Sequence, residues 1–181
     1  MCLVAATKGD VTLKNVIPKH LEAISSKLEE IGVRVEESDE EVRIVADSRV
    51  RSSQIKTRVY PGFPTDMQPQ MTAVLMLGEG TSVVYESIFE NRFKYVNELL
   101  KMGATISVKS DQTAATIKGV ESVSGAEMNV PDLRAGAALT IAALAANGRS
   151  VLNNIEYIER GYEEFEVKLR GIGADIVKCT D

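Results

Sequence analysis

Residues 80–103 read GTSVVYESIFENRFKYVNELLKMG, a short β-rich run followed by a segment with helical periodicity that stops at a glycine. The same plan occurs twice more. Gly9 begins a run that leads to a helix ending at Gly32, and Gly148 begins one that leads to a helix ending at Gly173. The closing glycines lie 71 and 70 residues apart. A pattern that recurs at a fixed spacing indicates a repeated supersecondary unit.

The predicted helices carry apolar residues at steps of three and four, the pattern of a helix packed on a sheet. These residues are Leu21, Ile24, Leu28 and Ile31 in the first unit, and Tyr162, Phe165, Leu169 and Ile172 in the third. We expect the third helix to begin at residues 160–162, and each helix to end at a glycine in the left-handed conformation. A strand is predicted after each helix, over 33–36, 104–108 and 174–177.

The first two units continue with two further strands and a second helix. The strands are predicted over 41–45 and 54–59 in the first unit and over 113–118 and 126–130 in the second. Each second helix follows a proline and an aspartate. The plan of each unit is therefore strand, helix, two or three strands and helix, which predicts an α/β fold.

The two ends of the chain depart from this plan. Residues 1–8 match the tail of a second helix, and the third unit stops one strand after its helix. We therefore expect a single domain over residues 1–181, with units at about 9–79, 80–147 and 148–181 after a truncated helix. By the repeat, the third unit lacks its second and third strands. We expect the chain to be a piece of a longer protein, or to pair with another chain through open sheet edges.

The composition argues against several classes of function. Apolar residues make up 44% and charged residues 26% of the chain, the net charge is −5, and no basic run suggests a nucleic-acid surface. No stretch approaches the roughly 20 apolar residues of a membrane span. Cys2 and Cys179 have no metal-like spacing and His20 is the only histidine, so a metal site or a Ser-His-Asp triad is not expected. This cysteine usage suits a reduced, cytoplasmic protein.

Arg92 departs from the repeat. It occupies the helix position that Leu21 holds in the first unit and Tyr162 in the third. A core-facing position has become a cation at a helix start, where the helix dipole mildly disfavours it. Two interpretations are open: a surface arginine that packs its stem on the protein, or a ligand-binding cation. The dense cluster at residues 89–93, at a strand-to-helix turn, favours the second.

Aspartates stand at equivalent starts of the two second helices. Asp132 suits an N-cap, whereas Arg134 in the same turn has no capping role, which favours a ligand anion as its partner. Before the other helix, Thr65 and Gln68 have the spacing of a capping box around Asp66. An aspartate near a helix start stays ionised, which suits a base or a hydroxyl-binding group.

A third arginine, Arg160, stands before Gly161, where the residues indicate either a plain turn or a tight backbone approach to a ligand. All these positions lie at strand-to-helix junctions, where binding sites of α/β proteins are commonly built. Three arginines with two aspartates predict a site for an anionic, hydroxylated ligand, because the arginine fork binds phosphate and carboxylate in a bidentate manner.

Four motifs carry a family resemblance: PGFPTDMQ at 61–68, FENRF at 89–93, DLRA at 132–135 and RGYE at 160–163. Over essentially all 181 residues, the chain resembles the C-terminal part of the UDP-N-acetylglucosamine 1-carboxyvinyltransferases, a family of enolpyruvyl transferases. The sibling family that acts on shikimate 3-phosphate shares the fold but lacks this combination of motifs.

The resemblance implies a fold of two domains, each an inside-out α/β barrel of threefold βαβαββ units, of which this chain would hold one domain that is incomplete in its third unit. It implies transfer of the enolpyruvyl group of phosphoenolpyruvate to the 3-hydroxyl of UDP-N-acetylglucosamine in peptidoglycan synthesis, with release of phosphate. It implies no cofactor and no metal.

The resemblance also implies roles for single residues. Asp66 matches the likely base, which contacts the sugar hydroxyl. The backbone of Ile88 and the ring of Phe89 match positions that hold the UDP-sugar, and Arg160 matches an arginine that binds phosphoenolpyruvate. Three further residues, Arg92, Asp132 and Arg134, match family residues in the cleft between the two domains. The resemblance implies that they bind anions or position the substrates.

Other family features are missing from this sequence. The second domain of the family carries a mobile loop with a general-acid cysteine, a Lys-Asn pair and further arginines, and neither Cys2 nor Cys179 matches these. In the family, the two absent strands come from the extreme N-terminus of the full chain. We therefore expect the isolated chain not to turn over substrate. A binding or assembly module, pairing with itself or with a separate N-terminal chain, is the alternative, and a nucleic-acid-binding module is the weakest hypothesis.

Overall fold

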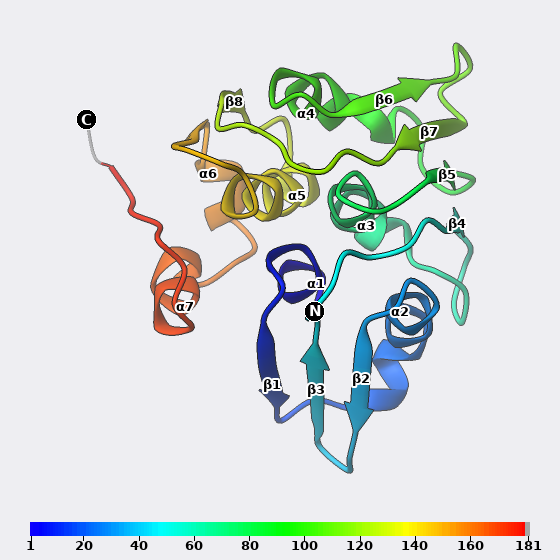
Figure 1. Cartoon of the computed structure of the whole chain (residues 1–181), viewed down its shortest axis with the longest axis vertical. Helices are drawn as coiled ribbons and strands as arrows, with labels where there is room; N and C mark the ends of the chain where they lie inside the picture. The colour runs from blue at the N-terminus through cyan, green and yellow to red at the C-terminus, as the bar shows by residue number, and fades with distance from the viewer. Residues whose placement is uncertain (180–181) are drawn as a thin grey trace.

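The computed structural model describes residues 1–179 (Figure 1). Residues 9–79 form β1 (Asp10–Lys14), α2 (Pro18–Glu30), β2 (Arg34–Glu37), β3 (Glu41–Val45), β4 (Gln54–Lys56), the 3-10 helix η1 (Thr65–Met67) and α3 (Gln68–Leu75). Residues 80–147 form β5 (Thr81–Tyr85), the 3-10 helix η2 (Arg92–Tyr95), α4 (Val96–Lys101), β6 (Thr105–Val108), β7 (Ala114–Lys118), β8 (Glu127–Asn129) and α5 (Leu133–Leu144). The remaining elements are α1 (Cys2–Thr7), β9 (Val151–Asn153), α6 (Glu156–Glu159) and α7 (Phe165–Gly171).

The first two stretches build sheets with the same strand order. The antiparallel arrangements β1–β3–β2 and β5–β7–β6 both place the third strand between the first and the second. β4 pairs with β5 in parallel, and β8 pairs with β9 in parallel. The last strand of one stretch therefore lies beside the first strand of the next. Within residues 1–179, β1 and β9 each have a strand partner on one side only.

Three helices, α1, α3 and α5, pack against one another in the middle of the molecule. All eight residues of α3 are buried, as are the eight consecutive residues Ala135–Ala142 of α5. α1 contacts both of these helices, and the sheets lie around the three (Figure 1). A helix that is apolar on all sides must be enclosed by protein, which explains why α5 is central while the amphipathic α2 is not. α3 is enclosed although it carries Gln68, Gln70 and Thr72.

The periodicities of the sequence account for the outer layer. Val42 and Ile44 of β3 are fully buried and alternate with the exposed Arg43 and the half-buried Glu41 and Val45. Leu28 of α2 and Leu99 of α4 are also fully buried. The closing glycines have φ angles of 100° at Gly32, 93° at Gly103 and 98° at Gly173. These values confirm the predicted left-handed caps.

The segment after residue 159 differs from the prediction. The expected long helix from residues 160–162 is absent; α6 ends at Glu159, and α7 starts only at Phe165, after Glu164 at a φ of 47°. The expected strand over 174–177 is absent too, because within residues 1–179 no strand lies there to complete a ladder. The predicted stripe is not enclosed either, since α7 has no fully buried residue and Ile172 is 55% exposed.

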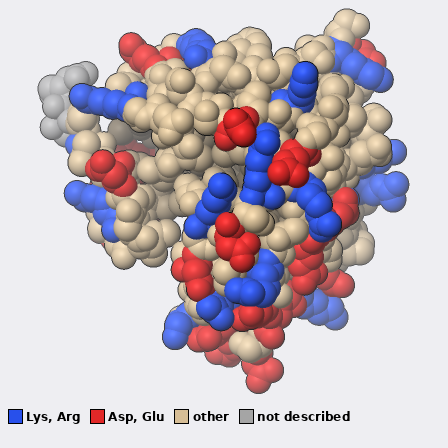
Figure 2. Space-filling view, in the orientation of Figure 1, with Lys and Arg blue, Asp and Glu red and all other residues tan. Residues whose placement is uncertain are grey.

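Charged side chains gather over the sheet β1–β3–β2, at the bottom of Figure 2, with acids and bases interspersed. On this sheet Arg43 binds Asp10 through two hydrogen bonds, Nε to Oδ1 at 3.0 Å and Nη2 to Oδ2 at 2.8 Å. Arg43 also donates to Glu36 at 3.1 Å. Within residues 1–179, no helix is both long enough and apolar enough to cross a membrane.

Candidate functional site

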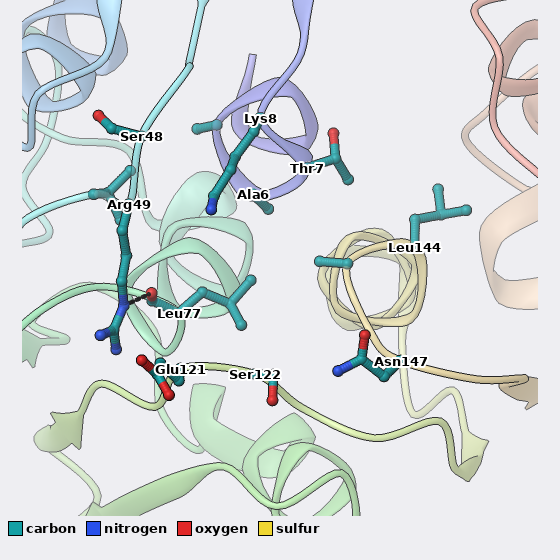
Figure 3. A pocket seen from close by; sticks show the side chains of 13 residues that line it. Ala6, Thr7, Lys8, Ser48, Arg49, Leu77, Glu121, Ser122, Leu144 and Asn147 are labelled. Atoms are coloured by element: carbon teal, nitrogen blue, oxygen red, sulfur yellow. Dashed lines mark hydrogen bonds between the residues drawn. The ribbon is translucent and has the colours of Figure 1, made fainter.

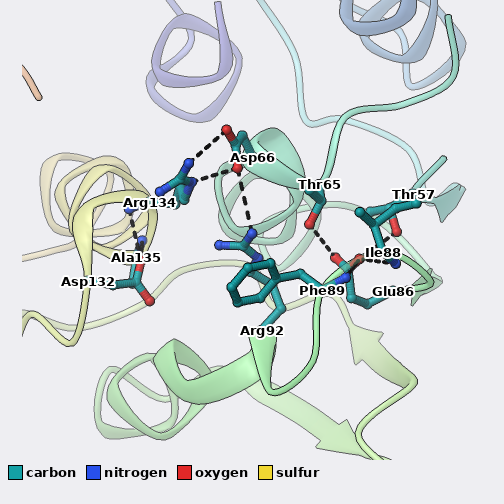
Figure 4. A network of polar contacts seen from close by, with 10 residues as sticks. All are labelled: Thr57, Thr65, Asp66, Glu86, Ile88, Phe89, Arg92, Asp132, Arg134 and Ala135. Atoms are coloured by element: carbon teal, nitrogen blue, oxygen red, sulfur yellow. Dashed lines mark hydrogen bonds and ion pairs between the residues drawn. The ribbon is translucent and has the colours of Figure 1, made fainter. Parts of the chain in front are cut away.

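Asp66 and Arg134 form a bidentate ion pair although they lie 68 residues apart in the sequence (Figure 4). Arg134 donates from Nε to Oδ1 at 2.6 Å and from Nη2 to Oδ2 at 2.9 Å. Asp66 lies in η1, just before α3, and Arg134 lies in the first turn of α5. Because α3 and α5 pack together along the core, their amino-terminal ends bring these two side chains within reach.

The ion pair shifts both titrations in the direction that keeps both groups charged. The hydrogen bond from Arg134 holds the pKa of Asp66 below its usual value, and the charges of Arg134 and Arg92 act in the same direction. The same bond raises the pKa of Arg134. Asp66 is therefore ionised but occupied. Both of its carboxylate oxygens accept hydrogen bonds from Arg134.

Arg92 is buried beside this pair. Its side chain is 6% exposed, and its Nη2 lies 3.6 Å from Oδ1 of Asp66. Its guanidinium carbon lies 4.1 Å from the centre of the Phe89 ring, close enough for a cation–π contact. Its Nε has no hydrogen-bond partner in the described structure. The hypothesis of a surface arginine is therefore wrong, and the position is core-facing as the repeat predicted.

Asp132 caps α5, as predicted. Its Oδ1 accepts hydrogen bonds from the backbone N–H groups of Arg134 and Ala135, both at 2.9 Å. Its carboxylate therefore serves the helix start, and in doing so it places Arg134 opposite Asp66.

The predicted capping box at Thr65 is wrong. No side-chain cap forms at η1 or α3, and the Thr65 hydroxyl instead donates to Oε2 of Glu86 at 2.9 Å. Sequence reasoning missed Glu86, although a signal was present. The alternation of buried residues in β5, Ser82 and Val84, continues to Glu86, which is 6% exposed. A carboxylate on the buried face of a strand needs hydrogen-bond donors around it.

Ile88 and Phe89 form an exposed apolar turn next to the cluster. They are 45% and 57% exposed, and Figure 4 shows the Phe89 ring over Arg92. Beside them lies a shallow depression of about 590 Å³, lined by residues 58–62 together with Ser87 and Ile88. The large exposed apolar side chains of this depression, Val59 and Tyr60, are each 76% exposed.

Arg160 is not among the residues paired with Asp66 in the described structure. It is exposed and ends α6. Its neighbour Gly161 contacts the start of α5: a Cβ at Gly161 would come within 2.7 Å of the Leu133 side chain. Gly161 thus lies close against the first residue of α5, and the choice between a plain turn and an approach to a ligand stays open.

A second hollow lies at the opposite ends of the same helices (Figure 3). It has a volume of about 290 Å³ and is lined by residues that include Lys8, Arg49 and Asn147. Arg49 donates to the carbonyl groups of Leu77 at 2.8 Å and Gly78 at 2.7 Å. This arginine gives two of its donors to carbonyls that follow α3, which is a structural role.

The arrangement at the amino-terminal ends is suited to anions. Two arginines converge on one aspartate, one of them is buried with an unused donor, and the starts of α3 and α5 add positive helix-dipole ends. Ile88 and Phe89 supply an apolar contact beside this charge. In the described part of the chain, no group of three His, Cys, Asp or Glu residues is placed to hold a metal.

Several known proteins are similar in sequence to this chain. The family profile described as EPSP synthase (3-phosphoshikimate 1-carboxyvinyltransferase) matches residues 1–169. A protein of Desulfofundulus thermocisternus named UDP-N-acetylglucosamine 1-carboxyvinyltransferase is 52% identical over 97% of this chain and 72% of its own length. UDP-N-acetylglucosamine 1-carboxyvinyltransferase 3 of Symbiobacterium thermophilum is 50% identical over 97% of this chain and 41% of its own length.

A similar solved structure is that of the enolpyruvyl transferase NikO from Streptomyces tendae, with a TM-score of 0.85 and 26% identity over 96% of this chain and 42% of that one. EPSP synthase from Acinetobacter baumannii has the same fold, with a TM-score of 0.69 at 16% identity. The chain thus spans about two fifths of the length of several relatives that it matches. It belongs to the enolpyruvyl transferase family and has UDP-N-acetylglucosamine 1-carboxyvinyltransferases among its relatives.

Proposed function

We propose that this chain is the part of a UDP-N-acetylglucosamine 1-carboxyvinyltransferase that binds the UDP-sugar and phosphoenolpyruvate for peptidoglycan synthesis in the cytoplasm. The observation that carries the proposal is the cluster of Asp66, Arg92 and Arg134 beside the Ile88–Phe89 turn. The names of the relatives support the substrate class. Both Cys2 and Cys179 are free, which suits the reduced setting.

In this proposal, Arg92 and Arg134 neutralise phosphate or carboxylate groups, and Arg160 joins them from the loop against α5. Asp66 contacts the 3-hydroxyl of the sugar and takes its proton once Arg134 has turned to an anion. Asp132 positions Arg134, and the Ile88 backbone and the Phe89 ring hold the UDP-sugar. Anion binding and proton transfer by such groups lower the barrier of group transfer.

We further propose that residues 9–79, 80–147 and 148–181 are three units of one domain, the third of them incomplete, and that the isolated chain does not turn over substrate. The equal strand orders and the parallel β4–β5 and β8–β9 pairs support this organisation.

A specific observation favours the alternative of an assembly module. β1 and β9 have unpaired edges within residues 1–179, and such edges pair with other chains. Light scattering after size exclusion separates the two, because a strictly monomeric, folded chain would count against edge pairing.

The ligand proposal is tested by titrating the chain with UDP-N-acetylglucosamine while the backbone amides are followed by NMR. We expect saturable shifts at Ile88 and Phe89, and an affinity at least about tenfold lower in Arg134→Lys, because lysine cannot form the fork. Arg43→Lys is the matched control, since Arg43 forms the same fork with Asp10 on the distant sheet. Equal losses in both variants would refute the assignment. Phosphate release from both substrates by the chain alone would refute its inactivity.

A further inference from the structure

Glu86 is a buried carboxylate that receives four hydrogen bonds from three separate segments. Its Oε1 accepts from the Thr57 hydroxyl at 2.7 Å and from the backbone N–H groups of Ile88 at 2.9 Å and Phe89 at 3.0 Å. Its Oε2 accepts from the Thr65 hydroxyl at 2.9 Å. Thr57 follows β4, Thr65 begins η1, and Ile88 and Phe89 follow β5. Glu86 therefore connects three chain segments that meet at the candidate site (Figure 4).

The surroundings of Glu86 are specialised, because no arginine, lysine or histidine forms an ion pair with it in the described structure. Two hydroxyls and two backbone amides satisfy it instead. An apolar side chain would avoid the cost of burying a carboxylate, so stability alone does not explain the choice of residue. Thr57 is held in turn by Ser87, whose hydroxyl donates to its carbonyl at 2.5 Å and whose N–H donates to its hydroxyl at 2.9 Å.

The contacts of Glu86 close a ring with the charged cluster. Thr65 precedes Asp66, whose carboxylate lies 3.6 Å from Arg92. Arg92 lies against the Phe89 ring, and the N–H of Phe89 returns to Glu86. The position of the aspartate and the position of the aromatic ring are thus both fixed by one buried carboxylate.

We propose that Glu86 is a positioning residue that holds the Thr65–Asp66 helix start and the Ile88–Phe89 turn in a fixed relation, so that Asp66 and Phe89 meet the same ligand. The part of this proposal that concerns a ligand rests on the proposed function. The fixed relation between the two segments does not, and it is measurable in the chain without any ligand.

The test compares the 181-residue chain with Glu86→Gln, which keeps the size of the side chain but places an amide NH₂ where an acceptor oxygen was. The matched control is Glu30→Gln, another carboxylate that bridges segments, through Ser53 at 2.5 Å and Lys27 at 2.6 Å, away from the site. In Glu86→Gln we expect amide hydrogen exchange at Ile88 and Phe89 to be at least about tenfold faster. We also expect the NMR titration midpoint of the Asp66 carboxyl to move up towards its ordinary value.

A folded Glu86→Gln chain with unchanged exchange at both amides and an unchanged Asp66 titration would overturn the proposal. If this variant does not fold, the test uses Thr65→Val and Thr65→Ser, because only serine keeps the hydroxyl that donates to Glu86. The titration midpoint of Asp66 should move up in Thr65→Val and stay at the wild-type value in Thr65→Ser. UDP-N-acetylglucosamine is then added as a separate measurement, in which Glu86→Gln should bind at least about tenfold more weakly than wild type. Absence of binding by the wild type would refute the proposed function, while the ligand-free measurements would still decide the role of Glu86.

Discussion

Two arginine–aspartate forks in this molecule have nearly the same geometry and different surroundings. On the sheet β1–β3–β2, Arg43 binds Asp10 and also donates to Glu36 at 3.1 Å, so one guanidinium pairs with two carboxylates. At the helix starts, Arg134 binds Asp66 while Arg92 approaches the same carboxylate, so one carboxylate pairs with two guanidinium groups. The first fork is a satisfied surface network, and the second leaves donors unused. The buried Nε of Arg92, which has no hydrogen-bond partner in the described structure, distinguishes the second fork from the first.

The largest expected effect comes from removing Asp66, the carboxylate that Arg92 and Arg134 share. Asp66→Ala leaves the buried Arg92 without a counter-charge, and we expect a loss of about 2 kcal/mol in the free energy of unfolding. This is less than the roughly 3–5 kcal/mol of a fully buried pair, because the Asp66 side chain is 56% exposed. Asp10→Ala is the comparison and should lose markedly less. Urea denaturation of both variants checks this, and equal losses would remove the distinction between the forks.

Replacing the buried cation should separate stability from binding. Arg92→Leu restores the residue type that Leu21 provides at the equivalent position. We expect the variant to be more stable than wild type, with a free energy of unfolding about 1 kcal/mol higher, because replacing a buried ion by an apolar residue is often neutral or stabilising. Binding of inorganic phosphate or phosphoenolpyruvate should be lost. A destabilised variant that still binds these anions would show that Arg92 serves the core and not the ligand.

The cap of α5 should have a smaller and more local effect. Asp132→Ala is expected to cost about 1 kcal/mol, the usual value for loss of an N-cap. Asp132→Ser keeps an acceptor at the helix start and should recover most of that loss. If Asp132 acted on ligands through its charge, the serine variant would remain defective in UDP-N-acetylglucosamine binding although it is stable. Thermal unfolding and ligand titration of both variants test this.

The smallest effect is the pH dependence of the Asp66 fork. Because the folded-state pKa of Asp66 is lowered by Arg134, its stabilisation is complete above the unfolded value of about 3.9 and is lost as the pH falls through the lower folded value. We expect less than about 1 kcal/mol, given solvent screening. Urea denaturation of wild type and Asp66→Asn between about pH 6 and pH 2 should show curves that converge at the acid end. A gap that widens with acid would contradict the lowered pKa.

Much of the fold could be predicted from local pattern. The closing glycines, the alternation in β3 and the apolar α5 each reflect a requirement that a few neighbouring residues express by themselves. The strand predicted over 174–177 could not be judged in this way, because a strand forms only with a partner, and the sequence around it does not show whether one is present. The stripe of α7 was misleading for the same reason, since there is no sheet for it to cover in the described structure.

The site was predicted in its residue types but not in its connections. Arg92 was identified because it replaces an apolar residue of the repeat, and Asp132 because caps follow local rules. The pairing of Asp66 with Arg134 depends on how α3 and α5 pack and has no local signal. Glu86 had one, the buried alternation from Ser82 through Val84. Its bonds from the Ile88 and Phe89 amides are local, but the hydroxyls of Thr57 and Thr65 come from segments that only the folded chain brings to it.

The fork between Arg134 and Asp66 has a further consequence for solution behaviour. Arg134 cannot give the same two N–H groups to Asp66 and to an incoming anion, so an anion that takes them releases the carboxylate. The released Asp66 loses the contact that lowers its pKa and gains affinity for a proton. By thermodynamic linkage, binding of such an anion would be accompanied by uptake of a fraction of a proton in the acidic range in which Asp66 titrates, and within that range the anion would bind more tightly as the pH falls.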